Sequence, residues 1–343
     1  MLHSLALKSD GTVVAWGNND FYQLGDGEGV DYDQEFPVPV VDLTDVTAVS
    51  AGAGHSLALK SDGTVWGWGY NDSGQVGNGD DDAEIVEEPD QVLLAGGGEV
   101  SSSIRAQIEE VPFTGVIAIS GGGLHSLALK SDGTVWAWGF DQLGQLGDGD
   151  DDNDSEYNPV QAGAPTTTST STSTTTASSQ ALTDVVAISA GFGHSMALKS
   201  DGTVWVWGVN NFYGLDVQGV LGLGEDAENV VYSPVQVPGL SNVVAIYAGL
   251  RSSYVLKDDG TVWGWGDNSS NQLGYLGAGE QPDIVFSPVQ LRKENEDETI
   301  SYITDIVSIA VGYSHAIFVK EDETYTILGE LDVPMEIIDS FFD

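Results

Sequence analysis

Cysteine is absent from this sequence of 343 residues, so neither disulfides nor thiolate metal sites can form. Basic residues are scarce, because ten Lys and Arg stand against 53 Asp and Glu, for a formal net charge of -43. A surface of this sign repels nucleic acid and anionic membranes. The balance is typical of a protein that works in very high salt or is secreted. Specific recognition of a partner through acidic groups is the weaker alternative.

Long apolar runs are also missing. No stretch approaches the length of about 18 apolar residues that a transmembrane helix needs. The first residues, from Met1 to Ser4, lack the charged and apolar regions of a signal peptide, and we expect the chain to begin inside a repeat. The predicted location is extracellular or at the cell surface, with the cytoplasm of a salt-accumulating organism as the alternative.

A segment of 15 residues recurs six times, as in HSLALKSDGTVWGWG from His55 to Gly69. The fifth copy lacks the histidine and the sixth lacks both tryptophans. Recurrence at intervals of roughly 50 to 70 residues indicates a repeat architecture. The six copies begin at His3, His55, His125, His194, Ser252 and His315.

Each repeat contains four pieces with the alternation of β-strands, which we term a to d in chain order. Piece b is HSLALK, piece c is TVWxWG, and piece d is a short run around Pro159, Pro234 or Pro288. The Asp-Gly step between b and c predicts a hairpin with a type I′ turn, in which both central residues have positive φ. In the sixth copy Glu323 replaces this glycine, and we expect a looser turn there.

Four antiparallel strands in each of six repeats predict an all-β propeller of six four-stranded blades, with seven blades and a solenoid as the alternatives. We expect one domain over residues 1–343, with inserts at 95–114 and 164–180. The second insert is nearly pure Thr and Ser, which is typical of disorder. All nine tryptophans lie in pieces c and are expected to pack between blades.

The segment HSLALKSDGTVWAWG, followed by Gly144-Gln145-Leu146-Gly147, closely resembles the regulator of chromosome condensation repeat family. The resemblance covers nearly the whole chain and suggests the bacterial or archaeal type. It implies a propeller, usually of seven blades. The family includes a Ran nucleotide exchange factor, a plant ultraviolet-B receptor and a secreted β-lactamase inhibitor. The inhibitor branch uses the loop face of the propeller, which suits this sequence best of the three by fold analogy.

In such a blade the a–b and c–d loops emerge on one face, and the b–c and d–a loops emerge on the other. The b–c turns are nearly identical here, whereas the a–b and c–d loops vary and carry aromatic side chains. Exposed aromatic and Arg side chains are favoured interface anchors. The alternative is that these rings pack onto neighbouring loops. The candidate partner-binding residues are Phe21, Tyr22, Tyr70, Leu124, Phe140, Phe192, Phe212, Tyr213, Arg251 and Tyr313.

The histidines share one repeat slot in different blades, so we expect structural hydrogen bonds rather than a metal site. Acidic c–d loops, one from Asp148 to Glu156 and one from Asn78 to Glu84, make calcium a weaker alternative. The EF-hand pattern fails in the first loop, since Asn153 stands where glycine is needed. The weak calcium candidates are Asp148, Asp150, Asp152 and Asp154.

Sequence motifs for catalysis are missing: there is no Gly-rich phosphate loop, no Gly-x-Ser-x-Gly elbow and no metal-binding His pair. We therefore predict a protein that is not an enzyme, needs no cofactor and binds a protein partner of unknown identity on its a–b/c–d loop face. The alternatives are a structural repeat module of a larger secreted or surface protein, and a secreted enzyme inhibitor. A GTPase exchange factor and a hydrolase that uses carboxylates in the central channel are the least favoured interpretations.

Overall fold

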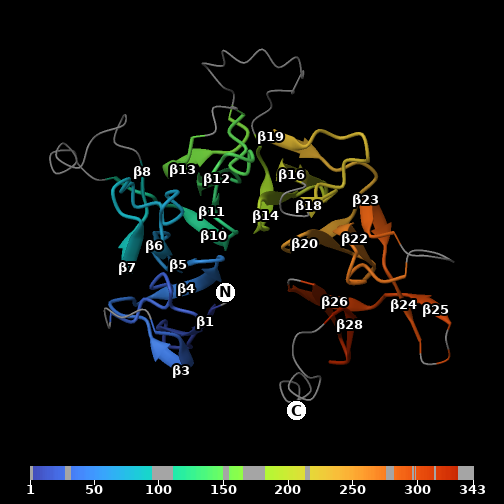
Figure 1. Ribbon diagram of the computed structural model, residues 1–343, viewed down its shortest axis with the longest axis horizontal. Coiled ribbons are helices and arrows are strands. Elements are labelled where there is room, and N and C mark those ends of the chain that lie inside the picture. The colour runs from blue at the N-terminus through green and yellow to red at the C-terminus, as the bar shows by residue number, and fades with distance from the viewer. Residues whose placement is uncertain are drawn as a thin grey trace.

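The structure is a computed structural model in which the blades follow one another around a central axis (Figure 1). It describes residues 3–27, 32–94, 111–149, 154–164, 182–212, 217–275, 282–295, 297, 299–312 and 314–330. All regular elements in these ranges are β-strands, which form six main sheets. The prediction of an all-β propeller with six blades is thus confirmed, and the solenoid alternative is wrong.

Four of the blades have the four strands that the sequence predicts, in the order a-b-c-d. Blade 2 contains β4 (Val46–Ala51), β5 (His55–Lys60), β6 (Val65–Tyr70) and β7 (Ile85–Gln91). Blade 3 contains β10 (Val116–Gly121), β11 (His125–Lys130), β12 (Val135–Gly139) and β13 (Glu156–Gln161). Blade 4 contains β14 (Val185–Ala190), β15 (His194–Lys199), β16 (Val204–Val209) and β19 (Val230–Gln236). Blade 5 contains β20 (Val243–Ala248), β21 (Ser252–Lys257), β22 (Val262–Asp267) and β23 (Ile284–Gln290).

The two terminal blades each have three strands within the described residues. Blade 1 contains strands b, c and d, which are β1 (His3–Leu7), β2 (Val13–Gly17) and β3 (Gln34–Pro39). Blade 6 contains strands a, b and c, which are β26 (Ile306–Val311), β27 (His315–Lys320) and β28 (Tyr325–Gly329). The four-stranded pattern that the sequence predicts is thus complete in blades 2 to 5, and the described residues give three of the four strands in each of blades 1 and 6.

Three short hairpins extend from the blades. β8 (Leu93–Leu94) pairs with β9 (Val111–Pro112), so the insert predicted at 95–114 begins and ends on a two-stranded stalk. The others are β17 (Asn211–Phe212) with β18 (Val217–Gln218), and β24 (Arg292–Glu294) with β25 (Ile300–Tyr302). Residues 165–180 of the Thr/Ser-rich insert lie outside the described residues. In the described part of the chain no helix is long and apolar enough to cross a membrane.

The b–c hairpins form as the sequence predicts, but the predicted turn type is wrong. The amide of Gly63 donates to the carbonyl of Lys60 at 3.0 Å, and Gly63 has φ of 80°. Asp62 is not among the residues with positive φ. A four-residue turn followed by one left-handed residue is a three-residue hairpin loop with a bulge, not a type I′ turn. Only the glycine of the Asp-Gly step needs the left-handed conformation.

The sixth copy makes the same turn without glycine. Glu323 adopts φ of 67°, and its amide donates to the carbonyl of Lys320 at 3.0 Å. The hydroxyl of Thr324 donates to Asp322, as the corresponding threonine does in the other copies. The expectation of a looser turn is therefore wrong. Hydrogen bonds on both sides of Glu323 hold the backbone in a region that side chains disfavour.

The blades pack through the second tryptophan of strand c, whose exposed fraction is 0% in blades 2 to 5. The first tryptophan is half-buried, and the lysine that ends strand b covers its ring: Lys60 Nζ lies 5.0 Å from the centroid of Trp66. The predicted packing role is confirmed for the second tryptophan of these blades. The buried tryptophans are Trp68, Trp138, Trp207 and Trp265.

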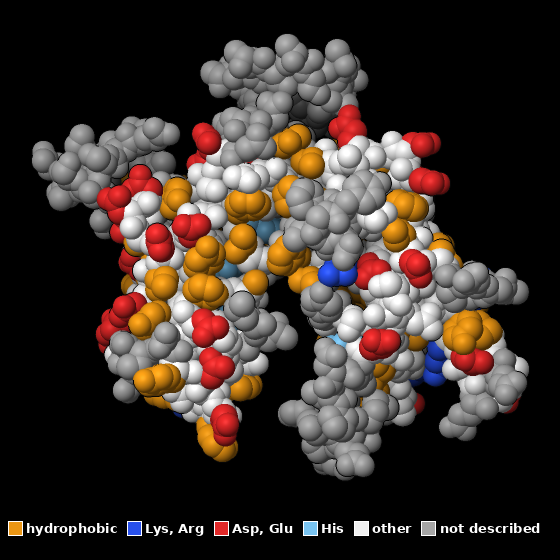
Figure 2. All heavy atoms as spheres, viewed as in Figure 1, with side chains coloured by type: hydrophobic (Ala, Val, Ile, Leu, Met, Phe, Trp, Pro, Cys, Tyr) orange, Lys and Arg blue, Asp and Glu red, His pale blue; other side chains and the backbone are white. Residues whose placement is uncertain are grey.

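Blades 1 and 6 stand on either side of an opening in the ring (Figure 1), which the space-filling view shows as a notch (Figure 2). Trp16 of blade 1, which occupies the slot of the buried tryptophans, is only half-buried, since no described blade packs on it from that side. The opening shows that the six described blades do not close the ring by themselves.

Candidate protein-binding face

The strand registers define the two faces of the propeller. In blade 2 His55 pairs with Gly69, so the a–b loop before His55 and the c–d loop after Gly69 emerge at the same end of the blade. At the opposite end, the amide of Ser61 in the b–c turn donates to the carbonyl of Asp45 in the preceding d–a loop. The structure thus assembles the loop face that the sequence predicts.

The base of the loop face is held by a hydrogen-bond relay between neighbouring blades. His55 Nε2 lies 2.9 Å from Ser126 Oγ in the next blade. Ser126 Oγ donates to the carbonyl of Gln75 at 2.8 Å, and Trp138 Nε1 donates to the same carbonyl at 3.0 Å. The relay recurs as His3–Ser56–Gln23–Trp68, His125–Ser195–Gln145–Trp207 and His194–Ser253–Val220–Trp265.

The relay fixes the protonation of its histidines. Because the serine hydroxyl gives its proton to the carbonyl, it accepts the proton of Nε2, and Nδ1 carries none. Burial lowers the pKa of His55 and His125 to about 3 and that of His3 and His194 to about 4. These four rings are therefore neutral at physiological pH, and the prediction of structural hydrogen bonds is confirmed for them.

At the joint between blades 5 and 6, different side chains donate to the relay carbonyl, which here belongs to Gln272. Ser252 replaces the histidine, and blade 6 has Ala316 and Leu328 in the slots of the relay serine and tryptophan. Tyr254 OH donates instead to the carbonyl of Gln272 at 3.1 Å and accepts from Ser252 Oγ at 3.1 Å. Burial raises the pKa of the Tyr254 phenol, so it remains a donor. Blade 6 thus lacks the serine and tryptophan donors of the relay, and the phenol of Tyr254 in blade 5 donates to the carbonyl in their place.

Above the relay, two of the candidate binding residues form a pair across blades. The ring centroids of Phe21 in blade 1 and Tyr70 in blade 2 lie 4.7 Å apart. Both side chains are half-buried, and Gly54 of the a–b loop lies beneath them, because a Cβ there would be 3.2 Å from Phe21 Cδ2. The structure thus brings together a residue of the c–d loop of blade 1 and the last residue of strand c in blade 2, although neither ring is fully exposed.

The other candidates lie in neighbouring a–b and c–d loops. In blade 3 the amide of Phe140 donates to the carbonyl of Leu124, and Phe192 of blade 4 packs close to Gly123. Leu124, Phe140, Phe192, Tyr22 and Arg251 are all half-buried, so the rings rest partly on neighbouring loops. Tyr213 and Tyr313 lie outside the described residues, as does the side chain of Phe212.

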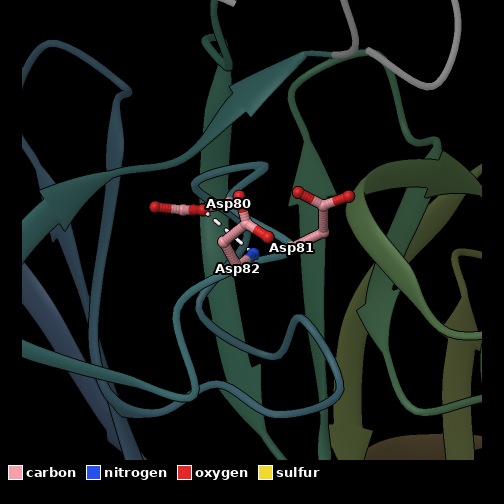
Figure 3. Close-up of side chains that lie close together, drawn as sticks. All are labelled: Asp80, Asp81 and Asp82. Carbon is pink, nitrogen blue, oxygen red and sulfur yellow. Dashed lines mark hydrogen bonds between the residues drawn. The ribbon is translucent and has the colours of Figure 1, made fainter. Parts of the chain in front are cut away.

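A cluster of carboxylates lies in the second of the two predicted acidic loops, from Asn78 to Glu84, and not at the individual residues named as calcium candidates. Oxygen atoms of Asp80, Asp81 and Asp82 lie within 4.8 Å of one another on the c–d loop of blade 2 (Figure 3). The amide of Asp82 donates to Asp80, so the loop partly satisfies its own carboxylates. Two of the three are exposed, and three carboxylates fall short of the six to eight oxygens that calcium takes. Among the predicted candidates Asp148 is half-buried, Asp154 is exposed, and Asp150 and Asp152 lie outside the described residues.

Sequence reasoning missed a set of exposed aliphatic side chains on the opposite face, which we term the aliphatic collar. Each is the second residue of the innermost strand a, where a bulge shifts the register against strand b. Their exposed fractions are between 53% and 57%. The signal was present in the repeated Val-Val and Val-Ile steps, but alternation alone does not reveal the bulge. The collar consists of Ile117, Val186, Val244 and Val307.

Repeated blades joined by relays of this kind define a repeat β-propeller whose buried polar side chains serve the joints between blades. The chain belongs to the regulator of chromosome condensation (RCC1) repeat family, whose models match residues 10–59, 62–129, 132–198 and 259–319. A second model of the same repeat matches residues 46–75, 116–145, 185–214 and 243–272.

Relatives of known name span most of this chain. The ultraviolet-B receptor UVR8 of Arabidopsis thaliana is 29% identical over 291 residues, which cover 84% of this chain and 55% of the receptor. The E3 ubiquitin-protein ligase HERC2 of Homo sapiens is 29% identical over 274 residues, which cover 79% of this chain and 5% of the ligase. The chain thus spans about half of the first relative and a small part of the second.

Among solved structures, the complex of Kap60 bound to yeast RCC1 (Prp20) contains a similar propeller. The TM-score is 0.68 at 23% sequence identity, and the alignment covers 96% of this chain and 68% of the other. This similarity supports the fold.

Proposed function

We propose that this propeller is a non-catalytic interaction module that binds a protein partner on its a–b/c–d loop face. The observation that carries the proposal is the Phe21–Tyr70 pair, which joins the c–d loop of blade 1 to the end of strand c in blade 2 at 4.7 Å between ring centroids. Half-buried aromatic rings of this kind are pre-positioned by the loops below, so little side-chain freedom is lost on binding.

The protonation of the relay histidines supports a role without catalysis. Each relay uses the Nε2 of its histidine for a joint between blades, and burial keeps the rings neutral. Buried side chains that are committed to these hydrogen bonds are not free to act as general bases. The structure of yeast RCC1, which has a similar propeller, contains the bound protein Kap60, and this supports a protein as the partner here.

The test is capture of partners on the immobilised propeller from extract and medium of its source, followed by affinity measurement with the purified partner. The double variant Phe21→Ala/Tyr70→Ala should bind at least about tenfold more weakly, because hot-spot aromatics carry most of the binding energy. The matched control is Val186→Ser/Val244→Ser on the aliphatic collar, which should bind normally. Equal loss in both variants, or no loss in the first, would refute the loop-face proposal.

A structural repeat module of a larger secreted or surface protein is the second candidate. HERC2, of which the matched segment is 5%, is a relative in which these repeats form a small part of a long chain. Absence of any captured partner in both low and high salt, together with longer coding sequence on either side, would favour this candidate. A secreted inhibitor of an enzyme is a special case of the loop-face proposal, and its partner would be that enzyme.

We further propose that the propeller works in high salt, either outside the cell or in a salt-accumulating cytoplasm. Six of the ten Lys and Arg occupy the one repeat slot at the end of strand b, where four of them cover tryptophan rings. Four of the ten basic residues thus have a packing role at this slot, while Asp and Glu are spread over the visible surface (Figure 2). Localisation of the tagged protein and the ionic composition of that compartment would test this.

A further inference from the structure

The outer edge of blade 6 differs from that of the complete blades. In blade 3, strand c (β12) pairs with strand d (β13), with Ala137 opposite Val160 and Gly139 opposite Glu156. In blade 6, strand c (β28) pairs with β27, and no strand pairs with its other side within the described residues. By the repeat alignment, Ile327 and Gly329 are the residues that would face a fourth strand.

A cavity of about 400 Å³ lies along this edge. One wall is β28, the second is the c–d loop of blade 5 at Asn271 and Gly274, and the third is the start of the β24–β25 hairpin. Lys293 and Glu294 of that hairpin line the cavity, with Lys293 Nζ at 3.3 Å from Thr326 Oγ1. The cavity therefore stands where the complete blades have strand d.

The complete blades show what fills the equivalent place. The c–d loop of one blade packs its glycine on an aromatic residue of strand d in the next blade: a Cβ at Gly144 would lie 3.0 Å from Tyr232 Cδ1, and one at Gly219 would lie 3.0 Å from Phe286 Cδ1. A proline follows each aromatic residue by two positions. Since strand d is an outer strand, the proline removes no hydrogen bond that the ladder needs.

The loop above the cavity has no glycine at this position. Asn271 takes its place, with φ of 63° and the same turn hydrogen bonds. Blade 1 also departs from glycine, with Tyr22 at φ of 58°, and the aligned residue of strand d in blade 2 is Glu87, which precedes Pro89 by two positions. A loop residue with a Cβ thus goes with a non-aromatic side chain in the facing strand. Lys293 adds a cation that favours an oxygen acceptor there.

We propose that the edge of β28 is a strand-addition site for an extended segment of a partner protein, with a side-chain oxygen opposite Asn271 and a proline two residues later. Strand addition supplies main-chain hydrogen bonds for affinity and side-chain pockets for specificity. In a second copy the strands d (β3, β7, β13, β19 and β23) each belong to a folded blade, so none of them is a separate extended segment that could enter the cavity.

The probe is a labelled peptide with the sequence of Ile85–Gln91, IVEEPDQ, and binding to the full chain is followed by fluorescence anisotropy. The salt concentration is about 0.5 M, so that the overall negative charge of the protein does not repel the peptide. Saturable binding at one site is expected. The peptide of Val230–Gln236, VVYSPVQ, should bind more weakly, because its tyrosine meets Asn271.

Two variants locate the site without relying on loss of binding alone. Asn271→Gly relieves a left-handed side chain and restores the loop of the complete blades, so the preference between the two peptides should shift toward VVYSPVQ by about tenfold. Ile327→Pro should abolish binding while thermal unfolding stays close to that of the parent. Phe21→Ala/Tyr70→Ala should not change peptide binding, which separates this test from that of the loop face.

Three results would overturn the proposal. They are the absence of saturable binding, a peptide preference that Asn271→Gly leaves unchanged, and binding that arises only in a chain shortened to end at Glu330. The last result would mean that the segment after Glu330 of the same chain occupies the edge, so that the site is not open to a partner.

Discussion

Single side chains decide how the blades of this propeller join. The hydroxyl of Ser126 lies between His55 of one blade and the Gln75 carbonyl of that blade's c–d loop, so one atom connects a strand and a loop across the interface. Ser4 stands in the same repeat slot in blade 1, where no described blade packs against it and no side-chain hydrogen bond links it to another described residue. The chain therefore contains a matched pair of serines with and without the relay.

Ser126→Ala is expected to lower the free energy of unfolding by about 1–3 kcal/mol, because it leaves the buried Nε2 of His55 without a partner. Ser4→Ala should change it by less than about 0.5 kcal/mol. Denaturant unfolding of both variants measures the difference. Equal effects from the two substitutions would show that the hydrogen bonds of the Ser126 hydroxyl do not stabilise the fold.

The relay histidines also set a pH dependence. Their pKa in the folded protein is lowered by burial to about 3 or 4, against 6.5 as the ordinary value, so the unfolded chain binds more protons between these limits. Stability is fully present above pH of about 6.5 and is lost as the pH falls toward 4, by up to about 1.4 kcal/mol per pH unit for each histidine.

Between pH of about 6.5 and 5 most carboxyl groups remain ionised, so this window isolates the histidines. His125→Gln should remove about one proton from the pH dependence of the unfolding free energy, whatever it does to stability at neutral pH. Unfolding curves at several pH values in this window, at constant salt, provide the slope. The histidine argument fails if parent and variant have the same slope.

At the scale of elements, the b–c hairpins are the most regular part of the chain. Each turn combines the hydrogen bond from Gly63 or its equivalent with an Asp–Thr bond, such as that from Thr64 Oγ1 to Asp62 at 2.7 Å. The hydrogen bonds from Thr64 lower the pKa of Asp62. Blade 6 reaches the same geometry with Glu323 in the left-handed conformation, so this element is strained where its neighbours are not.

Glu323→Gly should therefore stabilise the protein by about 0.5–1 kcal/mol, since relief of the left-handed side chain outweighs the added freedom of glycine in the unfolded chain. The reverse change in blade 3, Gly133→Glu, should destabilise it, because a Cβ there would lie 3.1 Å from the amide nitrogen of Asp184. Thermal unfolding of the two variants gives the comparison. Destabilisation by Glu323→Gly would mean that the glutamate makes a compensating interaction.

At the scale of the whole molecule, the dominant quantity is the net charge of -43. A single ion pair, Lys8 with Asp10 at 3.5 Å, joins described residues by their side chains, so most carboxylates are offset by solvent and counter-ions. Self-repulsion of this size destabilises the compact state. It weakens as the Debye length falls from about 10 Å at 0.1 M salt to about 3 Å at 1 M.

The melting temperature should therefore rise when KCl increases from about 0.1 M to about 1 M. Replacing Asp80, Asp81 and Asp82 by Asn should make the rise smaller, because that variant carries less negative charge in one crowded loop. Scanning calorimetry or intrinsic fluorescence follows the transition, and sucrose controls for general effects of cosolvents. A melting temperature that does not depend on KCl would contradict this account of the acidity.

The sequence by itself determined the elements, because strand alternation, the Asp-Gly step and the repeat of the WxWG segment are local properties of the chain. It placed strands b and c in every blade and strand d around Pro159, Pro234 and Pro288. It also indicated that the histidines are structural, since each occurs once in a blade. The turn type was wrong because a local pattern does not distinguish one left-handed residue from two.

Only the tertiary structure decided what happens between blades. The pairing of His55 with Ser126 joins residues 71 positions apart, and nothing local marks it. The hydrogen bond from Tyr254 to the carbonyl of Gln272 in blade 5 makes sense only beside Ala316 and Leu328 of blade 6, which replace the serine and tryptophan donors. The opening of the ring, the aliphatic collar and the cavity at β28 likewise depend on which surfaces meet, and such contacts between distant segments exist only once the chain has folded.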